Sequence, residues 1–152
     1  MNLKLKWSLK KFDDLNQEEL YSMLRLRSEV FVVEQRSIFL DMDNKDQKCN
    51  HLMGTLDGKV LAYSRIVPIG LSYEYTSIGR IVVALEGRSK GLGKELMAVS
   101  INAVEENYGI CPIRIGAQLY LKDFYSSFGF EQTSPHYDED GIMHIEMTRL
   151  CQ

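Results

Sequence analysis

The loop at residues 88–93 combines basic residues with two glycines at a point where a strand gives way to a helix. It reads Arg-Ser-Lys-Gly-Leu-Gly, after the strand-like run 78–84 and before the helical run 94–108. The first turn of a helix has backbone N–H groups without partners, and the helix dipole adds partial positive charge there. Because Gly91 and Gly93 have no side chains, an anion can approach this main chain closely. The spacing therefore predicts a phosphate-binding loop.

Two common phosphate-binding motifs do not match this loop. The ATP-type loop ends in Gly-Lys-Ser/Thr, whereas Gly93 and Lys94 are followed by Glu95. The dinucleotide motif G-x-G-x-x-G requires a third glycine where Leu96 stands. The loop therefore serves a different phosphate-containing ligand, or it is an ordinary glycine-containing turn.

A second group of interest is an aromatic segment downstream of the loop. The range 119–128 has apolar residues at helical spacing and predicts a short helix. Gly129 is typical of a helix end, and Phe130 would begin a strand. Taken alone, Tyr125 in this helix could be one more aromatic residue of the core.

Together the two segments resemble the GNAT N-acetyltransferase superfamily. The loop matches the family's Gln/Arg-x-x-Gly-x-Gly/Ala signature, which binds the pyrophosphate of acetyl-CoA, and residues 124–130 resemble its F-Y-x-x-x-G-F ending. In the family this tyrosine lies near the thioester sulfur and is the general acid for the departing thiolate, a role that would fall to Tyr125. Gln118 stands where many relatives have a cofactor-binding Asn. Seven residues before Tyr125, it would face the same side of a helix.

The resemblance implies that acetyl-CoA, as co-substrate, is bound by the loop, by the main chain of the preceding strand and by Gln118. These residues are Arg88, Ser89, Lys90, Gly91, Leu92, Gly93, Ile81, Val82, Val83 and Gln118.

Nearly the whole chain is similar to the ElaA-type subfamily of these acyltransferases. The similar segments are 26–35, Asp41 and Asp43, His51, 78–83, 117–118 and 139–147. The resemblance implies an α/β (α+β) fold, the GNAT fold, in a single domain spanning residues 1–152. It has a mixed central sheet of six to seven strands flanked by about four helices. The fourth and fifth strands splay apart to admit the pantetheine arm. The acceptor is not specified by this similarity.

The hydrophobic pattern of the chain agrees with such a fold. We expect strands at 3–8, 51–56, 59–67, 75–84, 113–117, 130–133 and 143–150. A first helix would begin after Asn16, with Glu19 completing a capping box. The segment 34–50 is polar and predicts a loop, while Asp57 and Gly58 form a favourable tight turn.

The composition is that of an ordinary globular protein. Of 152 residues, 45% are apolar and 26% are charged, which suits one domain with a full core. The net charge of −3 argues against a nucleic-acid partner, and no apolar run approaches the roughly 18 residues that span a bilayer. Cys49, Cys111 and Cys151 lack metal-ligand spacing, so we expect no metal and reduced thiols in the cytoplasm. An edge strand near the C-terminus could pair with a second copy, which leaves a homodimer open.

The expected reaction is transfer of an acetyl group to a primary amine by direct attack in a ternary complex. A fourth-strand amide such as that of Val82 would polarise the carbonyl group, and a base must deprotonate the ammonium form. The candidate bases are His51, His144, Glu34, Asp41 and Glu139. A water-relayed deprotonation without one essential base is an equal alternative, and either histidine could instead be structural.

Two acidic loops bear on the acceptor. One contains Asp41, Asp43 and Asp46, and the other spans residues 138–140. They either border the acceptor pocket and attract a cationic amine, or they are solvated loop charges. Arg25 and Arg27 on the first helix count against a purely acidic site.

Three hypotheses therefore follow from the sequence. The favoured one is an N-acetyltransferase that uses acetyl-CoA and a small-molecule or peptide amine. The second is a CoA-binding sensor or regulatory domain with little catalysis, and the third is a structural domain without a ligand.

Overall fold

Eight strands and three α-helices make up the part of the chain that the structure, a computed structural model, describes, residues 3–151. The strands are β1 (Lys6–Lys11), β2 (Asn50–Leu56), β3 (Lys59–Val67), β4 (Ser77–Val83), β5 (Ile113–Gln118), β6 (Phe130–Gln132), β7 (Tyr137–Glu139) and β8 (Ile142–Arg149). The α-helices are α1 (Gln17–Arg27), α2 (Leu92–Tyr108) and α3 (Lys122–Ser126). The α/β class is confirmed, with one strand more and one α-helix fewer than expected.

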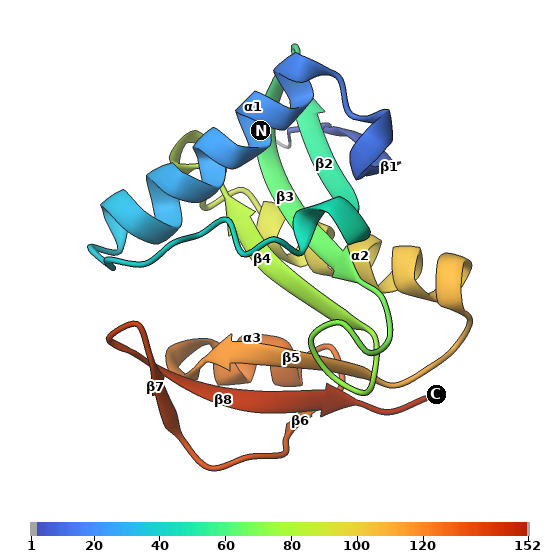
Figure 1. Cartoon of the computed structure of the whole chain (residues 1–152), viewed down its shortest axis with the longest axis vertical. Coiled ribbons are helices and arrows are strands. Elements are labelled where there is room, and N and C mark those ends of the chain that lie inside the picture. The colour runs from blue at the N-terminus through green and yellow to red at the C-terminus, as the bar shows by residue number, and fades with distance from the viewer. Residues whose placement is uncertain (1–2, 152) are drawn as a thin grey trace.

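The strands form two sheets that meet between β4 and β5 (Figure 1). The first contains β1 to β4 in chain order, all antiparallel, and the second has β8 between β5 on one edge and β6 and β7 on the other. Thr76 forms a parallel bridge with Ile113, and the Arg114 N–H donates to the Thr76 carbonyl at 3.0 Å. Past this bridge β4 and β5 separate into different sheets, which confirms the expected splay.

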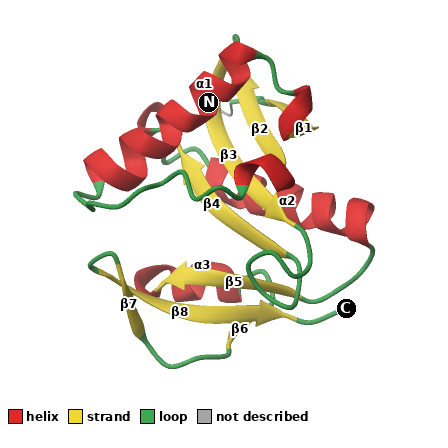
Figure 2. Cartoon of the chain, in the orientation of Figure 1, coloured by secondary structure: helices red, strands yellow, loops and turns green. Residues whose placement is uncertain are grey.

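The helices cover the sheets from both sides (Figure 2). Helix α1 packs against β3 and β4 on one face, and α2 packs against the same strands from the other. Helix α3 contacts β5 and β6. The core correspondingly has two apolar clusters, one around α1 and the first sheet and one between α2 and the second sheet. None of the helices within residues 3–151 has the length and apolar content that crossing a membrane would require.

Two local features, a helix cap and a hairpin turn, lie where the sequence predicted them. The Asn16 side chain accepts from the Glu19 N–H at 2.8 Å, and the Glu19 carboxylate accepts from the Asn16 N–H at 3.0 Å, which completes the capping box of α1. Asp57 and Gly58 have φ of 50° and 78° and join β2 to β3, as a tight hairpin requires.

Three elements differ from the predicted pattern. The first strand covers residues 6–11 and not 3–8, because its pairing with β2 continues to Lys11. Strand β7 was not expected, and it forms because Asp140 and Gly141, with φ of 53° and 85°, make a two-residue turn to β8. Within residues 3–151 there is no fourth α-helix, and Ser28–Glu34 prolongs α1 as a π-helical segment.

A β-bulge interrupts β4 at its centre. The register with β3 shifts by one residue between the pairs Tyr63–Val82 and Arg65–Gly79. Two residues of β4, including Arg80 with φ of 51°, therefore oppose a single residue of β3. Such bulges redirect side chains and are common beside active sites.

Candidate active site

A cavity of about 850 Å³ occupies the space between the diverging strands β4 and β5. Its wall includes both strands, the N-terminus of α2, the π-helical segment and the turn between β7 and β8. One cavity therefore joins the predicted phosphate loop to Tyr125 and to His144. This arrangement could hold two substrates side by side.

The phosphate loop has the geometry that its spacing predicts. Gly91, with φ of 77°, is the N-cap of α2, and its carbonyl accepts the first helical bond from Glu95 N–H at 3.2 Å. The N–H groups of residues 92–94 therefore precede the helical ladder and are available to an anion. A Cβ at Gly91 would meet nothing within 4 Å, and one at Gly93 only Phe124 at 3.9 Å, so the approach is open.

The side chains of this loop have different surroundings. Leu92 is buried at 2% exposure and packs into the core, so only its main chain could reach a ligand. The Lys90 ammonium donates to the Glu86 carbonyl, just before the loop, at 3.0 Å, and Ser89 lines the cavity. Arg88 holds both carboxylate oxygens of Glu34, with Nη2 to Oε2 at 2.8 Å.

That ion pair argues against Glu34 as the base. The hydrogen bond from Arg88 holds the pKa of the Glu34 carboxyl below its usual value. A carboxylate with a lowered pKa and both oxygens engaged accepts a proton poorly. Glu34 instead connects the end of the π-helical segment to the phosphate loop.

The open edge of β4 presents Val83 and not Val82. The Ala84 N–H donates to the Leu61 carbonyl on β3 at 2.8 Å, and Val82 pairs with Tyr63 in the same register. Since N–H groups alternate between the two edges of a strand, the Val82 N–H points to β3 and the Val83 N–H points away from it. The Val82 amide, expected to polarise the carbonyl group, thus faces β3, and the N–H at the open edge is that of Val83.

Tyr125 lies on α3 at the cavity wall and is only 6% exposed. Its ring contacts Phe124 and Phe130 edge to face. Burial raises the pKa of the Tyr125 phenol well above its usual value. The hydroxyl is therefore protonated near neutral pH and is a hydrogen-bond donor at the cavity wall.

Gln118 also lines the cavity, but it lies on a strand and not on the helix face that was expected. It is the last residue of β5, and a 3₁₀ turn at Leu119–Leu121 separates it from α3, so it does not share a helix face with Tyr125. Its amide donates to Gln35 Oε1 at 3.2 Å across the gap between the two sheets. A second bridge, from Ser37 Oγ to the Asp140 carbonyl at 2.7 Å, spans the same gap.

His144, like Glu34 and Glu139, is a candidate base that lines the cavity. It is 7% exposed, and its Nδ1 lies 2.7 Å from the Ile142 carbonyl, which requires a proton on Nδ1. In the neutral ring the lone pair is then on Nε2, which lies 3.3 Å from the Glu139 carboxylate. The ring stacks on Tyr137 at 5.8 Å between centroids, which fixes its orientation.

His51, by contrast, lies outside the cavity wall and is completely buried. Its Nδ1 is 2.6 Å from the Tyr63 hydroxyl and its Nε2 is 2.9 Å from the Asp46 carbonyl. Burial lowers the pKa of this ring. With both nitrogens bonded inside the protein, His51 is structural, and its candidacy as the base is withdrawn.

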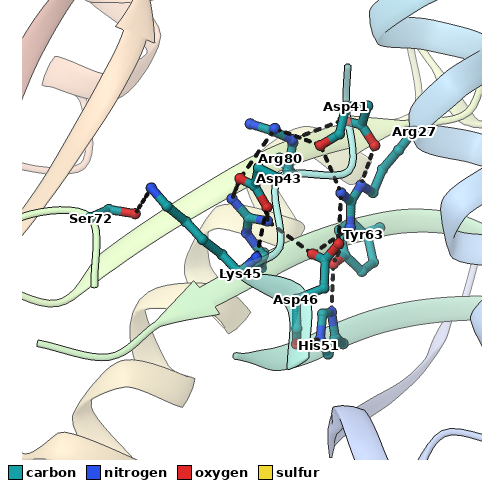
Figure 3. Close-up of polar contacts among 10 residues, drawn as sticks. Arg27, Asp41, Asp43, Lys45, Asp46, His51, Tyr63, Ser72 and Arg80 are labelled. Carbon is teal, nitrogen blue, oxygen red and sulfur yellow. Dashed lines mark hydrogen bonds and ion pairs between the residues drawn. The ribbon is translucent and has the colours of Figure 1, made fainter. Parts of the chain in front are cut away.

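The carboxylates of the first acidic loop are neither free to attract an amine nor solvated charges, although Asp43 lines the cavity. Its three carboxylates pair with three arginines from α1, β3 and β4 (Figure 3). The ion pairs are Arg27–Asp41, Arg27–Asp46, Arg65–Asp43, Arg65–Asp46, Arg80–Asp41 and Arg80–Asp43, at 2.7–3.4 Å.

These six charges cancel, and most are desolvated. The Arg27 side chain has no exposed surface, and Asp46 has 7%. The arginines hold the pKa of Asp46 below its usual value despite its burial. Asp41 is buried in the same network, so it is no longer a candidate base. No spacing rule in the sequence links these three aspartates to the three arginines.

Comparison with known proteins agrees with this geometry. A family model described as an acetyltransferase (GNAT) domain matches residues 31–151. The chain belongs to the GNAT acetyltransferase family. It is 35% identical to the protein ElaA of Escherichia coli over 147 residues, which are 95% of this chain and 96% of ElaA. It is also 37% identical to a UPF0039 protein of Synechocystis over 146 residues, 95% of each chain.

Solved structures give the same result. An acyl-CoA N-acyltransferase from Pseudomonas aeruginosa is 38% identical, with a TM-score of 0.92 over 96% of this chain and 99% of that one. The crystal structure of E. coli ElaA is 34% identical, with a TM-score of 0.90 over the same shares. The GNAT fold and the ElaA-type resemblance are confirmed, and the protein is a GNAT-family N-acyltransferase.

Proposed function

We propose that this GNAT protein transfers an acetyl group from acetyl-CoA to a primary amine of a small molecule or peptide, by direct attack in a ternary complex. The observation that carries the proposal is the continuous cavity from the N-terminus of α2 to Tyr125 and His144. The family uses an acyl-CoA donor, and one GNAT neighbour, from Elizabethkingia anophelis, was solved with acetyl-CoA bound. That neighbour is 14% identical with a TM-score of 0.65, so its likeness supports the fold only.

Donor binding would use mainly backbone groups. The N–H groups of residues 92–94 suit a pyrophosphate, and the open edge of β4 at Ile81 and Val83 suits the pantetheine amides as an added strand would. Arg88, Ser89 and Lys90 supply positive charge and hydroxyl donors at the same end, and Gln118 borders the opposite wall. Because Gly91 and Gly93 have free space where a Cβ would be, the ligand is not blocked.

The chemistry needs one proton acceptor and one proton donor. His144 Nε2 would take a proton from the ammonium group, with Glu139 stabilising the imidazolium that forms. The neutral amine nitrogen attacks the thioester carbon while the Val83 N–H stabilises the oxyanion. The C–S bond then breaks, and the thiolate takes the Tyr125 proton. The nitrogen of the new amide loses its remaining extra proton, which restores the Tyr125 phenol. Holding both substrates in one cavity supplies a further part of the acceleration.

A donor-saturated screen of amines, followed by release of free CoA thiol, tests this proposal. Tyr125→Phe should lower kcat by about 10²-fold or more, the usual contribution of a general acid. Tyr120→Phe is the matched control, because Tyr120 lies in the 3₁₀ turn just before α3 and is 73% exposed. A wild-type rate for Tyr125→Phe would refute the acid role.

The two other hypotheses have different outcomes. CoA at about 100 times its dissociation constant should stabilise the chain by roughly 2.7 kcal/mol. Stabilisation by CoA without turnover of any amine would indicate a sensor. Absence of any thermal shift at millimolar CoA would indicate a domain without this ligand.

We also propose that residues 1–152 act as one catalytic domain in the cytoplasm. All three cysteines, Cys49, Cys111 and Cys151, are unpaired, which suits a reducing compartment.

A further inference from the structure

The acceptor end of the cavity has walls of opposite charge. On the side of the first sheet, the loop after the π-helical segment contributes Lys45, and β4 contributes Arg80. On the side of the second sheet, the turn between β7 and β8 contributes Glu139 and Asp140, with His144 beside them. The acceptor would lie between these walls.

Lys45 is the cationic side chain on this wall that has no acidic partner among residues 3–151. The other cavity-lining cations are engaged: Arg65 and Arg80 pair with aspartates, and Arg88 pairs with Glu34. The Lys45 ammonium makes one hydrogen bond, to the Ser72 hydroxyl at 3.1 Å, and both residues line the cavity (Figure 3). Two of its three N–H groups are therefore left for a ligand.

Arg80 has an unused donor on the same wall. Its Nε and Nη2 bind Asp41 and Asp43, whereas no described residue accepts a hydrogen bond from its Nη1. The side chain is 24% exposed. Arg80 and Lys45 lie next to the same carboxylate, since Asp43 accepts from Arg80 at 3.4 Å and from the Lys45 backbone N–H at 3.1 Å.

Because the charges of the first acidic loop are neutralised, the net charge of this wall is positive. Three arginines balance Asp41, Asp43 and Asp46, so Lys45 adds an uncompensated positive charge. Glu139 and Asp140, in contrast, have no lysine or arginine partner within the described chain. A polyamine would suit only one of the two walls, because Lys45 would repel its second ammonium group.

We infer that the acceptor is an amino acid, whose ammonium group faces Glu139 and His144 and whose carboxylate is bound by Lys45 and Arg80. This inference rests on the proposed acetyltransferase function and specifies its substrate class. The carboxylate would receive charge-assisted hydrogen bonds from Lys45 Nζ and Arg80 Nη1. The amine end is thereby directed toward the His144 ring, which is to deprotonate it.

The test compares matched acceptors and matched lysine variants. The wild-type enzyme with saturating acetyl-CoA is assayed with α-, β- and γ-amino acids, with their carboxamides, and with the corresponding simple amines and polyamines. Lys45→Met removes the ammonium group while its backbone bond to Asp43 is kept, and Lys45→Arg restores the charge. Lys48→Met is the control, because Lys48 is an exposed lysine three residues away.

An amino acid should be turned over with a kcat/KM at least about tenfold above that of its carboxamide, the size of one charge-assisted hydrogen bond. Lys45→Met should raise KM for the amino acid about tenfold and leave the carboxamide unchanged, Lys45→Arg should recover most of the loss, and Lys48→Met should change neither. Equal turnover of acid and carboxamide, or turnover of polyamines alone, would overturn the inference while the acetyltransferase function stands. Failure of every amine would overturn both.

Discussion

Replacing Asp46 with asparagine should strongly destabilise the fold. The Asp46 carboxylate accepts hydrogen bonds from Arg27 Nη1 at 2.8 Å, Arg27 Nη2 at 3.2 Å and Arg65 Nη1 at 2.9 Å. The Arg27 side chain is fully buried, and Arg65 is 4% exposed, so both charges would stay in the interior without their partner. Breaking a buried ion pair in this way costs about 3–5 kcal/mol.

The measurements are urea unfolding and thermal unfolding of wild type and Asp46→Asn, both followed by circular dichroism. At about 2–4 °C per kcal/mol for a chain of this size, the expected fall in Tm is roughly 6–20 °C. The control is Glu86→Gln. Glu86 forms an exposed ion pair with Lys59, with 48% of the Glu86 and 68% of the Lys59 side chain exposed. Its loss should lower the free energy of unfolding by no more than about 1 kcal/mol. The bond from His51 to Asp46 uses the backbone carbonyl and is not affected.

A loss below about 1 kcal/mol for Asp46→Asn, comparable with Glu86→Gln, would refute this reasoning. It would mean that water or a rearranged partner replaces the carboxylate. An unchanged m-value together with a lower midpoint would show that the loss comes from stability and not from a different unfolded state.

Three further predictions concern the donor loop, pH and the thiols. Gly93→Val should weaken CoA binding at least about tenfold by calorimetry with little loss of stability, because a Cβ there meets only Phe124 at 3.9 Å; an unchanged Kd would contradict the phosphate site. Burial lowers the pKa of His51 from its ordinary 6.5, so the unfolded state binds the extra proton. The free energy of unfolding should therefore fall as pH drops below about 6.5, and His51→Gln should flatten this slope in urea titrations at pH 7 to 5; equal slopes would exclude His51 as the cause. Cys151 is exposed and should react with a thiol reagent in the folded protein, whereas burial raises the pKa of Cys49 to about 11 and should protect it until unfolding; rapid labelling of Cys49 in the native state would show that this part of the core opens.

The sequence by itself determined the features that depend on neighbouring residues. The capping box at Asn16, the hairpin turn at Asp57 and the glycine-containing loop that leads into α2 were all predicted correctly. Each depends on hydrogen bonds or φ angles within a few residues, so spacing alone is sufficient. The resemblance to the GNAT family came from the same kind of short segment.

The edge of β4 and the roles of the histidines depended on tertiary structure. Whether Val82 or Val83 presents its N–H to the cavity is decided by the pairing with β3, which the strand's own residues do not contain. His51 and His144 have similar positions at strands, yet one is enclosed by Tyr63 and a backbone carbonyl and the other borders the cavity.

The acidic loop shows why such assignments need the fold. Asp41 and Asp46 are separated from Arg27 by 14 and 19 residues, and Asp41 is separated from Arg80 by 39. Only folding brings these charges together, and their desolvation depends on which other segments cover them. Spacing in the sequence can identify a carboxylate, but the surrounding packing decides whether it attracts a substrate or holds the protein together.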